Sequence, residues 1–443
     1  MKQIIRIIEE IALNLFFLLE NDFRMIYFYQ YCRNLRKNRD EIKQLQDKKL
    51  KKLIEHAYST CPYYKKAFDD AKISPKCINS SEDLKKIPNI TKADVNKNKK
   101  QMISQKYNIR KLTKDFSGGT TGEGVQFYKD KRYMQKARAV WMRDIYAHGY
   151  RPGDKMAWIW GSERETKDSS KIMKRIRRIL TRKIWFNPTN FEEETFYQWI
   201  IEEYNMFKPK FIYGYENAIL SMARLIEKRG IKIHKPQKVF STSESLNNRD
   251  YLEKVFGCEV IDQYGCREVL ALAIEDKNKI MRSDDDFVII EVNEKNEILL
   301  TPLEAYGMPL IRYRVGDLGI RKKSQKSNKH PFNSFDLTLA RTFEMFKTSN
   351  NTTIYSGEII HQASKKKVDV GEYQLVQNST NLITINIIGK KKDVKPEEID
   401  KLKKVITKLS GIIDVRVKFL NKRLIAKSGK IIAAKCLIES REK

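Results

Sequence analysis

The chain has 443 residues, too many for one ordinary hydrophobic core, so two or more domains are expected. Its formal net charge is +31, but the excess is mostly lysine scattered along the chain, which favours solvated surfaces and predicts no nucleic-acid partner. The six cysteines form no CxxC pair and the five histidines stand apart, which excludes a Cys/His zinc centre and indicates a reduced, cytoplasmic setting.

The first element expected is an amphipathic helix over Ile4–Leu19, which is rich in Ile, Leu and Phe. Polar and charged residues interrupt this stretch, so it is too short and too charged to span a bilayer. Packing against the body of the protein is one interpretation. Peripheral contact with the inner membrane surface is the other, and basic residues between Lys2 and Arg39 favour it.

The next segments are expected to be mainly helical. Leu50–Asn98 predicts short helices separated by breakers, with Thr91 as an N-cap. Gln126–Gly149 predicts a long amphipathic helix, and Met156–Trp160 predicts a short apolar strand. The basic stretch Thr166–Arg182 lacks interleaved aromatic residues, which favours a solvated helix or loop over a polyanion site.

A pattern of strand followed by polar turn then recurs. The strands are expected at Phe211–Tyr213, Lys238–Phe240 and Cys258–Ile261. The polar turns that follow them are Gly214–Asn217, Ser241–Ser245 and Asp262–Glu268. This alternation predicts an α/β fold with mixed, mostly parallel sheets, in which ligands bind outside the carboxyl ends of the strands.

The C-terminal part predicts a second unit. Phe287–Val292 and Glu297–Thr301 first predict a hairpin. A strand, a helix and a strand are then expected at 383–388, 396–409 and 412–419, as in a small α+β lid domain. We therefore predict a large domain over residues 1–339 and a small one over 340–443.

A glycine-rich loop occupies the stretch Asp115–Gly124. Three glycines and three hydroxyl residues fall within Ser117–Gly122. Glycine allows positive φ and close approach to a ligand, and hydroxyl groups suit phosphate oxygens or a Mg²⁺ shell. The Gly-Lys-Ser/Thr ending of a Walker loop is absent, and a flexible surface turn would by itself explain the composition equally well.

Taken in order, these motifs resemble the adenylate-forming (AMP-binding) superfamily, in its phenylacetate–CoA ligase-like branch. The CapK-type proteins associated with capsular polysaccharide genes are the most similar group. The residues that carry the resemblance are His56–Lys92, Ser117–Gly122, Ser243-Glu244, Asp262–Glu268 (Tyr-Gly-x-x-Glu), Tyr313–Asp317 (Tyr-Arg-x-Gly-Asp), Ala340-Arg341, Tyr373–Gln377 and Gly429-Lys430.

The resemblance implies that ATP activates a small-molecule carboxylic acid to an acyl-adenylate. The acyl group then passes to a thiol, coenzyme A or another acceptor. The implied nucleotide-binding residues are Ser117, Gly118, Gly119, Thr120, Thr121, Gly122, Ser243, Glu244, Asp262, Tyr264, Gly265, Asp317 and Arg341. Among them, Tyr264 would flank the adenine and Asp317 would accept hydrogen bonds from the ribose. Glu268 and Thr120 would hold Mg²⁺.

The implied catalytic residues are Lys430, on the small domain, and Glu268. Lys430 would stabilise the charge that develops as pyrophosphate leaves, which requires the small domain to close over the large one. The acyl pocket is expected from Tyr213, Gly214, Tyr215 and Ser241.

Three departures from the family pattern bear on these roles. Glu123 stands where many relatives have lysine, and Ala340 replaces the hinge glycine. Where some relatives carry a Cys/His zinc site, the chain reads Glu275-Asp276 and Met281-Arg282, so no zinc is predicted. A catalytically degenerate homologue that serves as a membrane-associated assembly protein is the alternative, and no oligomeric state is predicted.

Overall fold

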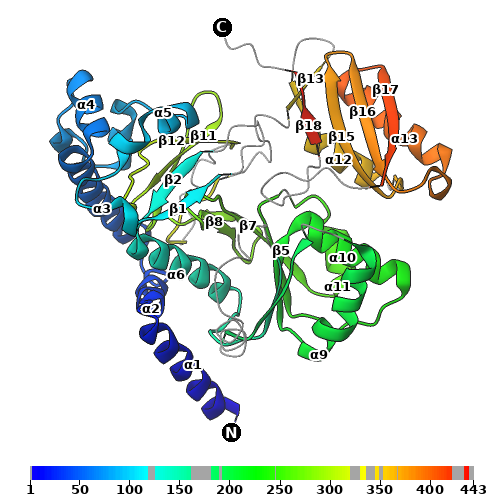
Figure 1. Ribbon diagram of the computed structural model, residues 1–443, viewed down its shortest axis with the longest axis horizontal. Coiled ribbons are helices and arrows are strands. Elements are labelled where there is room, and N and C mark those ends of the chain that lie inside the picture. Colours follow the sequence, from blue (N-terminus) through cyan, green and yellow to red (C-terminus); the bar gives the residue numbers. More distant parts are fainter. Residues whose placement is uncertain are drawn as a thin grey trace.

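The computed structural model describes residues 2–117, 125–160, 181–188, 192–244, 246–319, 330–335, 345–348, 353–366, 368–421 and 434–438. Figure 1 shows a large body that carries a mixture of helices and sheets, and a smaller C-terminal unit of strands and helices beside it. The basic stretch up to residue 180, the glycine-rich loop from 118 to 124 and the predicted domain boundary near 340 lie outside the described residues.

The N-terminal region is helical, as predicted. Its helices are α1 (Lys2–Leu19), α2 (Arg24–Asn34), α3 (Arg39–Thr60), α4 (Pro62–Asp70) and α5 (Lys92–Met102). The predicted N-cap is confirmed, because the Thr91 hydroxyl accepts a hydrogen bond from the Asp94 amide at 3.2 Å and Asp94 bonds back.

The expected helix over Gln126–Gly149 is wrong at its start. Residues Gln126–Lys129 form β2, which pairs antiparallel with β1 (Thr113–Phe116), and the helix α6 spans Lys131–Ala147. The Asp130 carboxylate accepts the Tyr133 amide at 2.8 Å and so fixes the helix start. Pairing with β1 therefore outweighs the helical periodicity of Gln126–Lys129.

A seven-stranded sheet forms the centre of the body, in the order β4-β3-β5-β6-β7-β8-β9. Its strands are β3 (Met156–Ile159), β4 (Lys183–Phe186), β5 (Phe211–Tyr215), β6 (Lys238–Thr242), β7 (Glu259–Tyr264), β8 (Ala273–Glu275) and β9 (Met281–Ser283). The first five in this order pair parallel and the last two antiparallel, which confirms the α/β prediction.

Different helices cover the two faces of this sheet. One face packs against α8 (Glu193–Gln198), α10 (Glu216–Arg229) and α11 (Arg249–Phe256) through residues such as Ile212 and Val239. The other face, which carries Phe211 and Phe240, joins the core that includes α6. Both faces are thus buried, as expected for parallel strands between helices.

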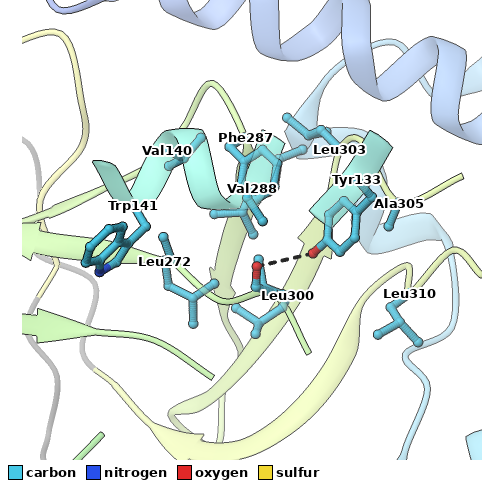
Figure 2. Close-up of a cluster of buried hydrophobic side chains, with 14 of the residues drawn as sticks. Tyr133, Val140, Trp141, Leu272, Phe287, Val288, Leu300, Leu303, Ala305 and Leu310 are labelled. Carbon is cyan, nitrogen blue, oxygen red and sulfur yellow. Dashed lines mark hydrogen bonds between the residues drawn. The ribbon is translucent and has the colours of Figure 1, made fainter. Parts of the chain in front are cut away.

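A three-stranded antiparallel sheet lies on the opposite side of α6. Its strands are β10 (Val288–Val292), β11 (Glu297–Pro302) and β12 (Tyr313–Leu318), so the predicted hairpin is confirmed. Figure 2 shows Tyr133 and Trp141 of α6 among Val288, Leu300 and other buried side chains of this region. The rings of Tyr133 and Phe287 stack at 5.6 Å.

The C-terminal unit has its own core, which includes Phe346, Leu375 and Leu402. Its elements are β13 (Met345–Lys347), β14 (Thr353–Tyr355), α12 (Ser356–Lys365), β15 (Glu372–Ser379), β16 (Leu382–Ile388), α13 (Pro396–Ser410), β17 (Asp414–Leu420) and β18 (Ala434–Cys436). The expected strand, helix and strand are β16, α13 and β17, in a four-stranded sheet of order β17-β16-β15-β18.

Candidate active site

The carboxyl ends of β5, β6 and β7 bring three predicted residues into one row. Gly214 is in register with Ser241, and Ser241 with Asp262. These residues were expected in turns after the strands, but they belong to the strands themselves. The strands are longer than predicted because these residues pair in register with the neighbouring strands, which extends each strand into its polar end.

Two members of this row show why their residue types matter. A Cβ atom at Gly214 would lie 2.6 Å from the carbonyl oxygen of Ile159, so only glycine fits beside β3. The hydroxyl of Ser241 is fully buried and makes no hydrogen bond within the described part of the chain. A buried unsatisfied hydroxyl costs roughly 1–3 kcal/mol, which a ligand at the strand ends would offset.

The four residues expected to form an acyl pocket do not share one face of the sheet. Tyr213 points toward α6, where its ring lies 5.3 Å from Trp141 and 4.6 Å from Trp158. Gly214 and Ser241 alternate with it and face the opposite side. Tyr215 is the last residue of β5, and its ring lies 4.3 Å from the ring of Trp160.

Two side-chain hydrogen bonds connect the Tyr-Gly-x-x-Glu segment with β12. The Tyr264 hydroxyl donates to Oδ2 of Asp317 at 2.8 Å, and the Tyr313 hydroxyl donates to Oε1 of Glu268 at 2.9 Å. Tyr313 and Asp317 both belong to β12. The two motifs predicted to bind nucleotide and metal therefore meet at one place.

The segment from Gly265 to Leu270 is held in a fixed shape. A Cβ atom at Gly265 would lie 2.2 Å from the carbonyl oxygen of Leu270, so this tight turn requires glycine. The Tyr133 hydroxyl of α6 donates to the carbonyl oxygen of Glu268 at 3.3 Å. The ammonium of Lys129 donates to the carbonyl oxygen of Arg267.

Lys129 also ties this segment to the hairpin that carries the glycine-rich loop. Its ammonium lies 2.9 Å from the Asp115 carboxylate, and both side chains are largely buried. Burial alone would raise the pKa of Asp115, but the Lys129 ammonium outweighs burial and the pKa of Asp115 is lowered. Arg267 approaches the same carboxylate at 4.0 Å.

Ser117 closes the base of the glycine-rich loop. Its amide donates to the carbonyl oxygen of Val125 at 2.9 Å, and the amide of Val125 donates to the Ser117 hydroxyl at 3.2 Å. The predicted phosphate-binding residues Gly118, Gly119, Thr120, Thr121 and Gly122 lie outside the described residues. The strands on either side of this stretch, β1 and β2, carry Asp115 and Lys129, and both residues contact Arg267.

The predicted adenine-side turn has a structural role at α10. Oε2 of Glu244 accepts the amide of Asn217 at 2.9 Å, in the first turn of that helix. Ser243 has a φ of 68°, an uncommon conformation for a residue other than glycine. The Glu244 side chain thus connects the turn after β6 to the first turn of α10.

Buried carboxyl groups gather on the same side of the sheet. Burial, and next the carboxylate of Glu275, raise the pKa of Asp262 to about 7. Burial also raises the pKa of Glu216, at the start of α10, to about 7. Arg249 contacts Glu275 at 2.6 Å and is the cation that offsets this cluster. Perturbed carboxyl groups of this kind favour a functional site at the strand ends.

Three residues of this site went unrecognised in the sequence. Tyr313 begins the Tyr-Arg-x-Gly-Asp motif, so its position there was a usable signal. Lys129 and Tyr133 carry no such signal, because the carbonyl groups that they bind lie more than a hundred residues further along the chain. The predicted Arg341 and Lys430, and the departures Glu123 and Ala340, fall outside the described residues.

No group of three or more His, Cys, Asp or Glu side chains that could hold a metal ion occurs among the described residues. In the region where some relatives were expected to carry zinc, Glu275 pairs with Arg249 and Asp276 with Arg282 at 2.8 Å.

No protein-family model matches the chain. Protein CapK of Staphylococcus aureus is 25% identical over 391 residues, which cover 85% of each chain. Phenylacetate-coenzyme A ligase of Aromatoleum evansii is 24% identical over 335 residues, which cover 70% of this chain and 74% of that protein. The sequence resemblance is thus spread over most of the chain.

Solved structures show the same fold. The 2-hydroxyisobutyryl-CoA ligase in the postadenylation state, in complex with R3-HIB-AMP, matches with a TM-score of 0.70 at 16% identity and covers 92% of both chains. The anthranilate CoA ligase in complex with anthranoyl-AMP matches with a TM-score of 0.51 at 13% identity, over 74% of this chain and 67% of that one. The fold of the adenylate-forming ligases and the resemblance to the phenylacetate–CoA ligase-like branch are thereby confirmed.

Proposed function

Because the chain has the fold of the adenylate-forming ligases, we propose that it is an enzyme that activates a carboxylic acid with ATP. The acid's carboxylate attacks the α-phosphorus and pyrophosphate leaves, which gives an acyl-adenylate. A thiol, for which coenzyme A is the expected source, then attacks the acyl carbon and displaces AMP. The similarity to a phenylacetate-coenzyme A ligase and to solved structures of CoA ligases supports both steps.

The observation that carries the proposal is the junction of two motifs. The Tyr264–Asp317 and Tyr313–Glu268 hydrogen bonds connect a strand end of one sheet to a strand of another. In the proposed complex, Asp317 accepts hydrogen bonds from the ribose and the Tyr264 ring lies against the adenine. The bond between them fixes the carboxylate before the nucleotide binds, which reduces the ordering cost of binding.

Mg²⁺ fits the chemistry of Glu268. A hard cation takes oxygen ligands, and Oε1 of Glu268 is oriented by Tyr313. We propose that the other carboxylate oxygen, Oε2, would hold the ion. The ion would neutralise phosphate charge as pyrophosphate leaves, and Thr120 is proposed to complete the protein's share of its ligands.

The remaining roles follow the family pattern. We propose Lys430 as the residue that stabilises the charge on the α-phosphate, with Arg341 at the hinge. Because Lys430 belongs to the C-terminal unit, that unit would close on the large one for adenylation. The residues Tyr213, Gly214, Tyr215 and Ser241 stay as proposed acyl-pocket residues, at the carboxyl ends of β5 and β6.

The proposal extends to the acceptor of the acyl group and to the biological role of the reaction. Coenzyme A suits the likeness to CoA ligases, and the similarity to Protein CapK supports a place in surface polysaccharide biosynthesis. The degenerate alternative gains no support from the described residues, because Glu268, Asp317 and Tyr264 keep both the residue types and the mutual bonds that the catalytic proposal requires.

The decisive experiment is ATP–pyrophosphate exchange with a panel of aryl, fatty and amino acids. We expect exchange that depends on one class of acid and on Mg²⁺, and that Lys430→Ala lowers at least about a hundredfold. The exposed Lys404→Ala serves as the matched control and should leave the rate unchanged. No exchange with any acid, despite measurable ATP binding, would contradict the proposal and restore the degenerate alternative.

A further inference from the structure

The outward face of α1 is entirely apolar over its last three turns. Between Glu9 and Leu19, the exposed positions are Ile11, Ala12, Leu15, Leu18 and Leu19. On a helix these positions share one arc of roughly 120°, and Leu19 is 79% exposed. Isolated exposed leucines are ordinary in proteins, but a continuous apolar arc marks an interaction surface.

The inward face of α1 is apolar as well. Leu13 and Phe17 are buried in the main core, so the helix is attached to the body and its outward arc stays uncovered. None of the described helices is both long and apolar enough to cross a membrane. Figure 1 shows α1 at the edge of the molecule with its N-terminal end projecting outward.

Exposed apolar side chains also occur at the start of the next helix, and exposed arginines follow them in the chain. Phe23 and Ile26 are exposed at the start of α2. Tyr29, also exposed, donates a hydrogen bond to Glu10, which places the two helices side by side. Arg33 is exposed seven residues after Ile26, on the same face of α2, and Arg36 is exposed just beyond the helix.

Two of the nearby acidic side chains are paired with arginines. Glu9 accepts a bond from Arg182 at 2.7 Å, and Asp22 accepts one from Arg24 at 2.8 Å. Their charges are therefore offset within the protein. What the surface presents outward is an apolar band followed by arginines, on a chain with a net charge of +31.

We propose that this surface, formed by Ile11–Leu19, Phe23 and Ile26 with Arg33 and Arg36, lies in the interface of an anionic membrane. Its apolar arc enters the boundary between headgroups and acyl chains, and its arginines contact lipid phosphates. A second copy of the chain would bring two sets of arginines and two strongly positive molecules together. Anionic lipid instead attracts each basic residue near its surface.

Vesicle co-sedimentation of the full chain tests the proposal. The wild type is expected to bind vesicles of phosphatidylcholine mixed with phosphatidylglycerol, and to bind them more weakly at high salt. It should bind vesicles of phosphatidylcholine alone only weakly. The double variant Leu15→Glu/Leu19→Glu should reduce binding to the mixed vesicles at least about tenfold, because two exposed apolar side chains that would enter the membrane become charged.

The control variant is Met206→Glu/Ile413→Glu, which adds the same two charges at residues that are 78% and 85% exposed elsewhere. It should bind like the wild type. Arg33→Gln/Arg36→Gln should weaken binding several-fold, whereas Lys391→Gln/Lys392→Gln, which removes equal charge from exposed positions, should not. Thermal melting verifies that each variant is folded.

Three results would overturn the proposal. One is equal binding of the wild type and Leu15→Glu/Leu19→Glu to the mixed vesicles. Another is wild-type binding that does not depend on phosphatidylglycerol or salt, a measurement that needs no variant. The third is a dimer in solution that Leu15→Glu/Leu19→Glu converts to a monomer, because a second copy would then cover this surface.

Discussion

The hydroxyl of Tyr264 donates a 2.8 Å hydrogen bond to the carboxylate of Asp317, across 53 residues of sequence. Tyr264 ends β7 of the central sheet, and Asp317 lies on β12, at the edge of the three-stranded sheet. The bond therefore locks together two sheets at the place where the nucleotide is proposed to bind. Four predictions follow from this and the neighbouring contacts.

Tyr264→Phe removes this bond and keeps the ring. We expect the KM for ATP in pyrophosphate exchange to rise about five- to tenfold, the equivalent of about 1 kcal/mol, because Asp317 is no longer held in position. The kcat should change little. Tyr204→Phe, which removes a 3.0 Å bond to the His234 carbonyl in the α10–α11 core, is the control and should leave the KM unchanged. An unchanged KM in Tyr264→Phe would show that Asp317 needs no positioning.

Tyr313→Phe removes the donor that orients the Glu268 carboxylate. Partners that orient a metal ligand typically change metal affinity about tenfold or more, so the Mg²⁺ concentration for half-maximal exchange should rise by about that factor. Tyr133→Phe loses only bonds to the backbone carbonyl oxygens of Glu268 and Val269 and should leave the Mg²⁺ requirement nearly constant. If both variants shift this requirement equally, Tyr313 supports the loop and not the ligand.

Lys129→Met leaves the partly buried carboxylate of Asp115 without its cation. We expect the free energy of unfolding, measured with urea, to fall by about 2 kcal/mol. Asp115→Asn in the same chain should recover part of that loss, since no charge then remains unpaired. Lys43→Met breaks an exposed 3.0 Å pair with Glu82 and should cost less than about 1 kcal/mol. Equal losses from the buried and exposed pairs would contradict this account.

Glu216→Gln should change how stability depends on pH. Burial raises the pKa of Glu216 from 4.5 to about 7, so between these values the folded chain keeps a proton that the unfolded chain has released. The protonated Glu216 side chain therefore makes its full contribution to the free energy of unfolding below about pH 4.5. This contribution is lost as the pH rises to about 7.

The neutral amide of the variant removes this loss. Glu216→Gln should resemble the wild type near pH 4 and be more stable by about 1–3 kcal/mol at pH 8. Melting temperatures across this pH range test the prediction, with the exposed Glu294→Gln as a control that should follow the wild type. A constant difference at every pH would mean that packing, and not charge, separates the two proteins.

Much of the local structure was predictable from sequence. Apolar spacing gave α1, the β10–β11 hairpin and the C-terminal strand, helix and strand, because side chains repeat every 3.6 residues on a helix and every two on a strand. The start of α6 was wrong because Gln126–Lys129 satisfies its backbone by pairing with β1, a contact that the pattern of one segment does not contain.

The sequence by itself determined which residues belong to the motifs, and their order identified the fold. The tertiary structure alone decided how those residues meet. It placed Tyr264 on Asp317 and Tyr313 on Glu268, joined Lys129 to a carbonyl 138 residues away, and put Tyr213 and Ser241 on opposite faces of one sheet. Propensity and periodicity act over a few residues, whereas these contacts depend on how whole sheets and helices pack to bury their apolar faces.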